Sequence, residues 1–304
     1  RPLAGASVRT KTRTLETDGA GRFRLDGAIT GGTGSGTFSF EPNWEFLEFL
    51  NGYGIDGYDE REMLVLAVTG VDRAFVSELD ALGYGDQLAG ELLIALGIHD
   101  VSPDYVREIT SRGLEGGSLE ELLAMRIHGV TAEFVDDVVA LGYELDAETL
   151  LAWRIHGVDR EFIEAVRAEG MNDPSSEDLV AMRVHGVSPS WLREMESAGF
   201  GPMEFETAIA FRVHGVSPEF LRAFEDLGYS SLDAEDLLAM RVHGVTTDLV
   251  GELRGLGYDN VSVGKLVAMK VHGVSTAFIE QQQQESDSTL SIDDLIEMKV
   301  LGHR

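Results

Sequence analysis

The residues of this 304-residue chain that could carry chemistry are its histidines, which recur at a nearly constant spacing. Imidazole titrates near neutral pH and binds transition metals, so a regular row of histidines would suit a pH sensor or a metal site. Cysteine is absent, which excludes thiolate zinc sites, disulfides and cysteine nucleophiles. The row consists of His99, His128, His156, His185, His214, His243 and His272.

Each histidine of this row lies in a motif of the type Arg-Val-His-Gly-Val or a close variant of it, as at residues 241–245. From His128 to His272 the steps are 28, 29, 29, 29 and 29 residues. A period this regular indicates a tandem repeat. We count about nine repeats between residues 43 and 304, each formed by two short helices, and expect a right-handed α-solenoid.

A structural role explains the histidines better than metal binding does. Stacked helices would place neighbouring histidines about 10 Å apart, whereas zinc binds its nitrogen ligands at about 2.0–2.1 Å. Histidine and arginine in the last helical turn can instead satisfy the final carbonyls and the negative end of the helix dipole. We therefore favour helix capping over a pH-responsive or metal-binding row, assign no metal ligand or cofactor-binding residue, and expect no cofactor.

The repeat at residues 216–244 shows which elements position the motif. Ser217 is a predicted N-cap with Pro218 at the first helical position, and Gly228 ends the first helix. The second helix is predicted to begin at Asp233, paired with Asp236 in a capping box, and to end before Gly244. We expect its buried face to consist of Leu237, Leu238, Met240 and Val242.

Other polar groups also have capping explanations. The pairs Glu120 with Glu121 and Asp293 with Asp294 lie in predicted first turns, where carboxylates favour the positive end of the helix. Ser188 and Ser217 are predicted caps without a nucleophile elbow. We therefore expect no catalytic residue and a chain that is not an enzyme. The aromatic residues follow helical spacing and suit a core, but Trp153 and Trp191 depart from the commoner residues at their positions and are candidate interaction aromatics.

Residues 1–42 differ from the rest and form a predicted β segment. Phe23 and Leu25, and then Phe38 and Phe40, alternate with polar residues on either side of a glycine-rich connection. This pattern predicts a β-hairpin or the edge of a small sheet. Because a lone hairpin is marginally stable in water, the segment should pair with another chain, pack on the first helices or be the remnant of a larger β domain.

The helical array is predicted to span residues 43–304, with residues 43–70 and 276–304 as atypical capping repeats. The first repeat has Thr69 where others have histidine, which suits packing against the β segment. The last has residues 281–287, Gln-Gln-Gln-Gln-Glu-Ser-Asp, in place of the usual Leu-Gly-Tyr. That polar run suits a solvent-facing end of the array. As an alternative, residues 281–288 form a disordered loop.

Composition limits the partners of the chain. The sequence has 24 Lys and Arg against 53 Asp and Glu, a net charge of −29. Such a field repels phosphate backbones and anionic membrane surfaces, so we expect no nucleic-acid partner. No apolar run approaches the roughly 20 residues that a membrane span needs, so we expect no membrane insertion. Basic peptides, cationic surfaces and divalent ions stay open as partners. The scarcity of lysine beside this acidity is also typical of halophile proteins, and equally of a GC-rich genome.

Repeats reading Leu-x-Ala-Met-Arg-Val-His-Gly-Val, with Gly-Tyr between the helices, resemble uncharacterised bacterial helical-hairpin repeats. Those repeats occur in extracytoplasmic regions of membrane metallopeptidases of the beta-lactam-sensor type and in related envelope proteins, often after a similar β segment. The peptidase motif His-Glu-x-x-His is absent from this sequence. The resemblance therefore implies a non-catalytic interaction or sensing module and an extracytoplasmic location; the residues themselves leave the location unknown.

From these features we expect a scaffold that presents an extended acidic surface to a protein or peptide partner. One alternative is a self-assembling fibre or surface-layer protein, in which the partner is a second copy of the chain. Another is a regulatory module whose histidine row responds to pH or metal.

Overall fold

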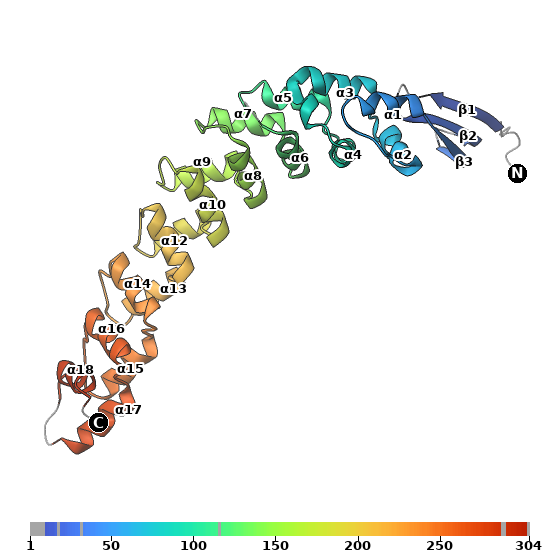
Figure 1. Cartoon of the computed structure of the whole chain (residues 1–304). Helices are drawn as coiled ribbons and strands as arrows, with labels where there is room; N and C mark the ends of the chain where they lie inside the picture. The colour runs from blue at the N-terminus through green and yellow to red at the C-terminus, as the bar shows by residue number, and fades with distance from the viewer. Residues whose placement is uncertain (1–9, 17–18, 31–32, 115–116, 287–289, 303–304) are drawn as a thin grey trace, which may run out of the picture. The chain divides into compact units, whose positions relative to one another are not determined.

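The computed structural model describes residues 10–16, 19–30, 33–114, 117–286 and 290–302. Across these residues a small antiparallel sheet precedes the helices α1–α18 (Figure 1). The chain divides into two compact bodies, which we call the N-terminal body (residues 1–155) and the C-terminal body (residues 156–304) and describe separately. The helical repeat array with an N-terminal β element confirms the predicted fold class.

The sheet contains one strand more than predicted. Its strands, in the order β1-β2-β3, are β1 (Thr10–Glu16), β2 (Gly21–Thr30) and β3 (Thr33–Pro42). The predicted hairpin is β2 with β3, where Phe23 lies opposite Phe40 and their ring centroids are 5.1 Å apart. Strand β1 was missed because its residues alternate threonine with lysine and arginine, which gives little apolar periodicity to recognise.

The base of the sheet is anchored to the first repeat. The backbone N–H of Asn43 donates to the carbonyl of the fully buried Ala20 at 2.8 Å, and the Asn43 side chain donates to the Gly19 carbonyl at 3.0 Å. Gly19 also forms a β-bridge with Asp72, and helix α2 contacts both β2 and β3. The sheet therefore packs on the first helices, which was one of the three predicted arrangements.

The N-terminal body repeats pairs of short helices after the sheet. Its helices are α1 (Trp44–Asn51), α2 (Glu60–Thr69), α3 (Arg73–Leu79), α4 (Gly90–Ile98), α5 (Pro103–Thr110), α6 (Leu119–Ile127), α7 (Ala132–Ala140) and α8 (Ala147–His156), with a π-helical turn η1 (Asp80–Tyr84) and a 3₁₀ turn η2 (Gly85–Gln87) after α3. Among the second helices of the repeats, α2 contacts α4 and α4 contacts α6. First helices α3, α5 and α7 contact one another in the same way.

The C-terminal body contains two rows of helices of its own. Its helices are α9 (Arg160–Ala168), α10 (Ser176–His185), α11 (Pro189–Ser197), α12 (Phe205–His214), α13 (Pro218–Glu225), α14 (Ala234–Val242), α15 (Thr247–Gly255), α16 (Val263–His272), α17 (Thr276–Glu285) and α18 (Ile292–Val300). The second helices α10, α12, α14, α16 and α18 contact in succession. Because helices this short are unstable alone, this stacking must supply most of their stability.

The predicted caps begin the helices as the sequence indicates. The hydroxyl of Ser217 accepts the Phe220 N–H at 3.2 Å with Pro218 as the first helical residue. Complete capping boxes form at Ser118 with Glu121, Ser175 with Asp178 and Ser291 with Asp294. Asp233 accepts the Asp236 N–H at 2.8 Å, which is one of the two bonds of its predicted box.

The glutamine run near the C-terminus is helical as far as Glu285. Helix α17 covers residues 276–285, and Gln282 is only 5% exposed, with its amide donating to the Glu285 carboxylate. The alternative of a disordered loop is therefore wrong for residues 281–285, because Gln282 takes a core position that an apolar residue fills elsewhere. Residues 287 and 288 of that prediction lie outside the described residues.

Candidate functional site

The arginine of the repeated motif lies against an aromatic ring on the first helix of its own repeat. In α14, the Arg241 guanidinium carbon is 4.5 Å from the centroid of the Phe220 ring. The same pairing recurs as Tyr105 with Arg126, Phe134 with Arg154, Phe162 with Arg183, Trp191 with Arg212 and Phe278 with Lys299, at 3.9 to 5.4 Å. Each such cation–π contact contributes on the order of 0.5–1 kcal/mol at an exposed site.

The same arginine also joins neighbouring repeats. Nε of Arg241 donates to the Gly215 carbonyl at 2.6 Å, and Nε of Arg212 donates to the His185 carbonyl at 3.4 Å. The acceptor carbonyls thus end the preceding second helix and not the helix that carries the arginine. The predicted capping by arginine is therefore present, but it acts between repeats.

The glycine of the motif makes room for this arginine. Gly186 has a φ of +72°, and a Cβ added there would lie 2.8 Å from Nη2 of Arg212. The left-handed backbone favours glycine, and a Cβ at this position would displace the end of the Arg212 side chain from its place. The final valine of the motif is buried in each repeat, as Val187 (1% exposed) and Val216 (1%) show.

The histidines lie on the surface. All seven are exposed: His99, His128, His156, His185, His214, His243 and His272. Within the ranges that the structure describes, no imidazole forms a hydrogen bond or an ion pair, so the histidine side chains do not cap the helices, contrary to the preferred sequence interpretation. The carbonyls they were expected to bind are reached by the arginine of the following repeat. No cluster of three or more potential metal ligands occurs among the described residues.

An exposed aliphatic residue precedes each histidine position. We call this set the aliphatic stripe; its members are 51% to 69% exposed. In the N-terminal body they are Val68, Ile98, Ile127 and Ile155, and in the C-terminal body Val184, Val213, Val242, Val271 and Val300. The prediction that Val242 is buried was wrong. Met240 and Val242 lie about 200° apart around a helix of 3.6 residues per turn, so they cannot both face the core.

Half-buried aliphatic residues extend the stripe along each second helix. One turn before Val242 lies Leu238, which is half-buried. Equivalent half-buried residues are Leu64, Ile94, Leu123, Leu151, Val180, Ile209, Val267 and Ile296. Residues four apart share one face of a helix, so each second helix presents an apolar ridge about two side chains long.

A row of exposed carboxylates borders the stripe on the side of the helix N-termini. Glu235 lies seven residues before Val242, which is about 10 Å along the same helix face. Exposed acidic residues stand at the same offset as Glu91, Glu120, Glu148, Glu177, Glu206 and Asp293. The stripe therefore has carboxylates along one border and imidazoles along the other, a surface that sequence reasoning missed because it placed the motif valine in the core.

The two candidate interaction tryptophans lie in the interior. Trp153 is fully buried in α8, with its ring 4.9 Å from that of Tyr143, and Trp191 is 6% exposed beneath Arg212. Each ring fills a core position of its repeat. Neither ring therefore forms the surface that an interaction aromatic needs.

Two further observations bear on the class of the protein. No helix among the described residues is long and apolar enough to span a bilayer. No protein-family model matches the chain, and no curated protein matches it. A function for this chain is therefore inferred from its own sequence and structure.

Proposed function

We propose that this chain is a non-catalytic scaffold that binds an extended, basic segment of a partner protein along the part of the aliphatic stripe that lies in the C-terminal body. The observation that carries the proposal is the exposure of a Val or Ile at one position in nine second helices. Single exposed apolar residues are ordinary on protein surfaces, whereas aligned ones are typical of interaction sites. Helix stability does not explain an exposed Val or Ile in the last turn of a second helix. β-Branched residues are poor helix formers, and basic side chains are favoured in a last turn.

The charge around the stripe supports a basic partner. Residues 1–42 contain six Lys or Arg and four Asp or Glu, so residues 43–304 contain the other 18 basic and 49 acidic side chains and carry a net charge of −31. The carboxylate row, including Glu177, Glu206 and Glu235, runs beside the stripe. Complementary charge would guide a basic segment to the surface, and the aliphatic contacts would hold it there.

The experiment compares two sets of substitutions at the same four positions. Val184, Val213, Val242 and Val271 are changed together to Thr, which keeps the shape and β-branching but adds a hydroxyl, or together to Ile, which keeps the apolar character. Losing apolar contact at four positions, at about 25 cal/mol per Å² of buried area, should weaken binding at least tenfold. All four side chains are exposed, so both variants should melt close to the unmodified chain.

Affinity capture from an extract of the source cells provides the measurement, with each variant as bait. A partner retained by the unmodified chain and the Ile variant, but lost from the Thr variant, supports the proposal. Equal retention by the Thr and Ile variants would show that the stripe does not bind the partner.

Self-assembly is the second candidate function, and one observation favours it. The Phe38 side chain is 60% exposed. It lies on β3, which is an edge strand of the three-stranded sheet β1-β2-β3. Exposed sheet edges and apolar faces can pair with a second copy. An apparent molar mass, measured by light scattering, that increases with protein concentration in the unmodified chain but not in Phe38→Ser would favour this function. A monomer mass at every concentration would exclude it.

A further inference from the structure

One repeat of the C-terminal body departs from the others at two positions that face each other. In residues 245–273 the first helix has Leu249 where other repeats have an aromatic residue, and the second helix has Lys270 where most have arginine. A surface recess of about 400 Å³ opens between these two positions. Its lining also includes Met269, Asp248 and Glu252.

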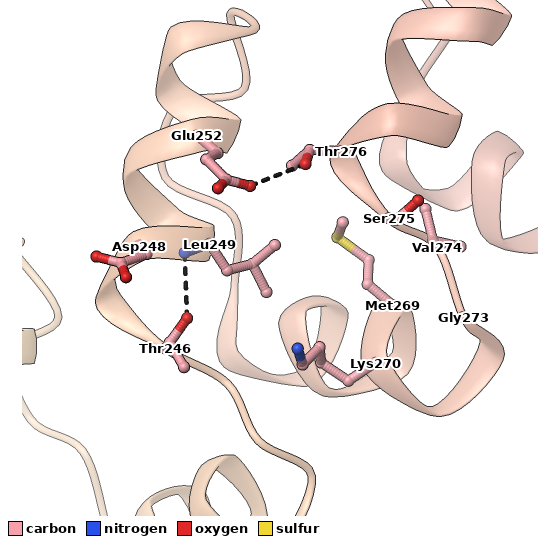
Figure 2. Close-up of a pocket in the computed structure, with 10 residues that line it drawn as sticks. All are labelled: Thr246, Asp248, Leu249, Glu252, Met269, Lys270, Gly273, Val274, Ser275 and Thr276. Atoms are coloured by element: carbon pink, nitrogen blue, oxygen red, sulfur yellow. Dashed lines mark hydrogen bonds between the residues drawn. The ribbon is translucent and has the colours of Figure 1, made fainter.

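The recess has an apolar floor and a polar rim. Figure 2 shows Leu249 and Met269 extending into the space between their helices, and Leu249 is 8% and Met269 0% exposed. On one side the Thr276 hydroxyl donates to the Glu252 carboxylate at 2.8 Å. Lys270, Asp248 and Glu252 are all exposed at the rim.

In the neighbouring repeats an aromatic ring occupies the corresponding place. The residue 29 positions before Leu249 is Phe220, whose ring lies under Arg241 at 4.5 Å. The residue 29 positions after it is Phe278, whose ring lies under Nζ of Lys299 at 4.1 Å. A lysine at this position therefore stacks on a ring when its own repeat provides one.

We propose that the recess binds an aromatic side chain that stands next to a basic residue in a partner polypeptide. The ring would pack against Leu249, above the fully buried Met269, and lie beneath the Lys270 ammonium, as Phe278 lies beneath Lys299. The neighbouring basic residue would meet the carboxylates of Asp248 and Glu252, which supply charge complementarity at the rim. In this repeat the aromatic ring of the cation–π pair would thus come from the partner, whereas neighbouring repeats supply both the ring and the cation themselves.

This site is separate from the aliphatic stripe. Neither Val271 nor His272 lines the recess, although both follow Lys270 directly. Changes at the stripe valines should leave ring binding unaltered, and changes at Leu249 should leave the stripe intact. The two proposals can therefore fail independently.

The probe is the tripeptide Lys-Trp-Lys containing 5-fluorotryptophan, followed by ¹⁹F NMR at about 0.15 M salt, where long-range attraction between charges is screened. We expect saturable binding with a dissociation constant on the order of millimolar, because few atoms are buried. Leu249→Phe should weaken binding at least tenfold, because the new ring fills the recess. Lys270→Ala should weaken it about two- to fivefold, the range of an exposed cation–π contact.

A matched variant in the preceding repeat tests the same idea in the opposite direction. Phe220→Leu should open an equivalent recess under Arg241 and raise the number of bound tripeptides from one to two. The double variant Phe220→Leu, Leu249→Phe should return to one. Unfluorinated Lys-Leu-Lys should compete poorly.

Two results would overturn the proposal. One is unchanged binding of Lys-Trp-Lys by the folded Leu249→Phe variant, which would place the probe elsewhere on the acidic surface. The other is equal competition by Lys-Leu-Lys, which would mean that charge alone holds the probe. Thermal unfolding of each variant, followed by circular dichroism, shows that loss of binding is not loss of fold.

Discussion

At the scale of single residues, the side chains of the repeated motif make different contacts. The arginine joins a ring and a neighbouring carbonyl, the glycine admits that arginine, and the last valine fills the core. The middle Val and His remain outside, and their outward position is the basis of the proposed interaction surface. Three of the five adjacent residues thus stabilise the array, and the other two are exposed.

Tyr105 provides a residue-scale prediction about alkaline pH. Its side chain is 5% exposed and donates to the Val130 carbonyl at 3.1 Å, and burial raises the pKa of Tyr105 to about 12 from its usual value of 10. The folded state therefore keeps this proton between pH 10 and 12 while the unfolded chain loses it. The stability that depends on the proton is complete below pH 10 and is lost as the pH rises toward 12, at up to about 1.4 kcal/mol per pH unit.

We expect Tyr105→Phe to lower the free energy of unfolding at pH 8, because the hydrogen bond is lost, by about 1 kcal/mol. Between pH 10 and 12 the variant should lose stability less steeply than the unmodified chain. Urea unfolding at pH 8, 10 and 11.5 measures both effects. Curves that stay parallel across this range would contradict the assigned role.

At the scale of elements, the sequence predicted the helix ends well and the contacts between helices poorly. Serine followed by proline, and serine followed three residues later by a carboxylate, act within one turn, so a local pattern reveals them. The partner of Arg241 on the first helix is Phe220, 21 residues earlier, and its acceptor at Gly215 belongs to another repeat. No local rule links these positions, so the arginine was assigned to the carbonyls of its own helix.

A double-mutant cycle tests whether the ring and the arginine stabilise the pairing of α13 with α14. Phe220→Ala and Arg241→Ala, singly and combined, should show a coupling energy of about 0.5–1 kcal/mol in urea unfolding. The control is the cycle of Leu249→Ala with Lys270→Ala in the repeat that lacks the ring, where the coupling should be close to zero. Equal coupling in both repeats would indicate that the ring contributes nothing specific.

At the scale of the whole molecule, charge is the dominant property of the helical array. Residues 43–304 carry a net charge of −31, and ion pairs leave this excess unchanged because each joins one acidic with one basic side chain. Pairs such as Arg107 with Glu78 and Lys265 with Asp293 are also solvent-exposed. Exposed pairs contribute little stability each. Mutual repulsion among the carboxylates should therefore destabilise the folded array at low salt.

Salt should accordingly raise the melting temperature. Increasing NaCl from about 0.02 M to 1 M shortens the screening length to about 3 Å, and we expect Tm to rise by at least about 5 °C. Calorimetry in NaCl and in KCl measures the effect, and both salts should act alike if screening is the cause. A Tm that is flat or falls with salt would show that the carboxylates do not repel one another appreciably, and would also argue against a halophile origin.

Three tyrosine hydroxyls donate hydrogen bonds to backbone carbonyls in the next repeat, at the same separation in sequence. Tyr58 donates to the Gly90 carbonyl, Tyr229 to that of Val261 and Tyr258 to that of Leu290, each across 32 residues. Since each repeat depends mainly on its neighbours, gain or loss of a whole 29-residue unit would re-form the same bonds at the junction. The length of the array is therefore a quantity that evolution can change in whole repeats without redesigning the fold.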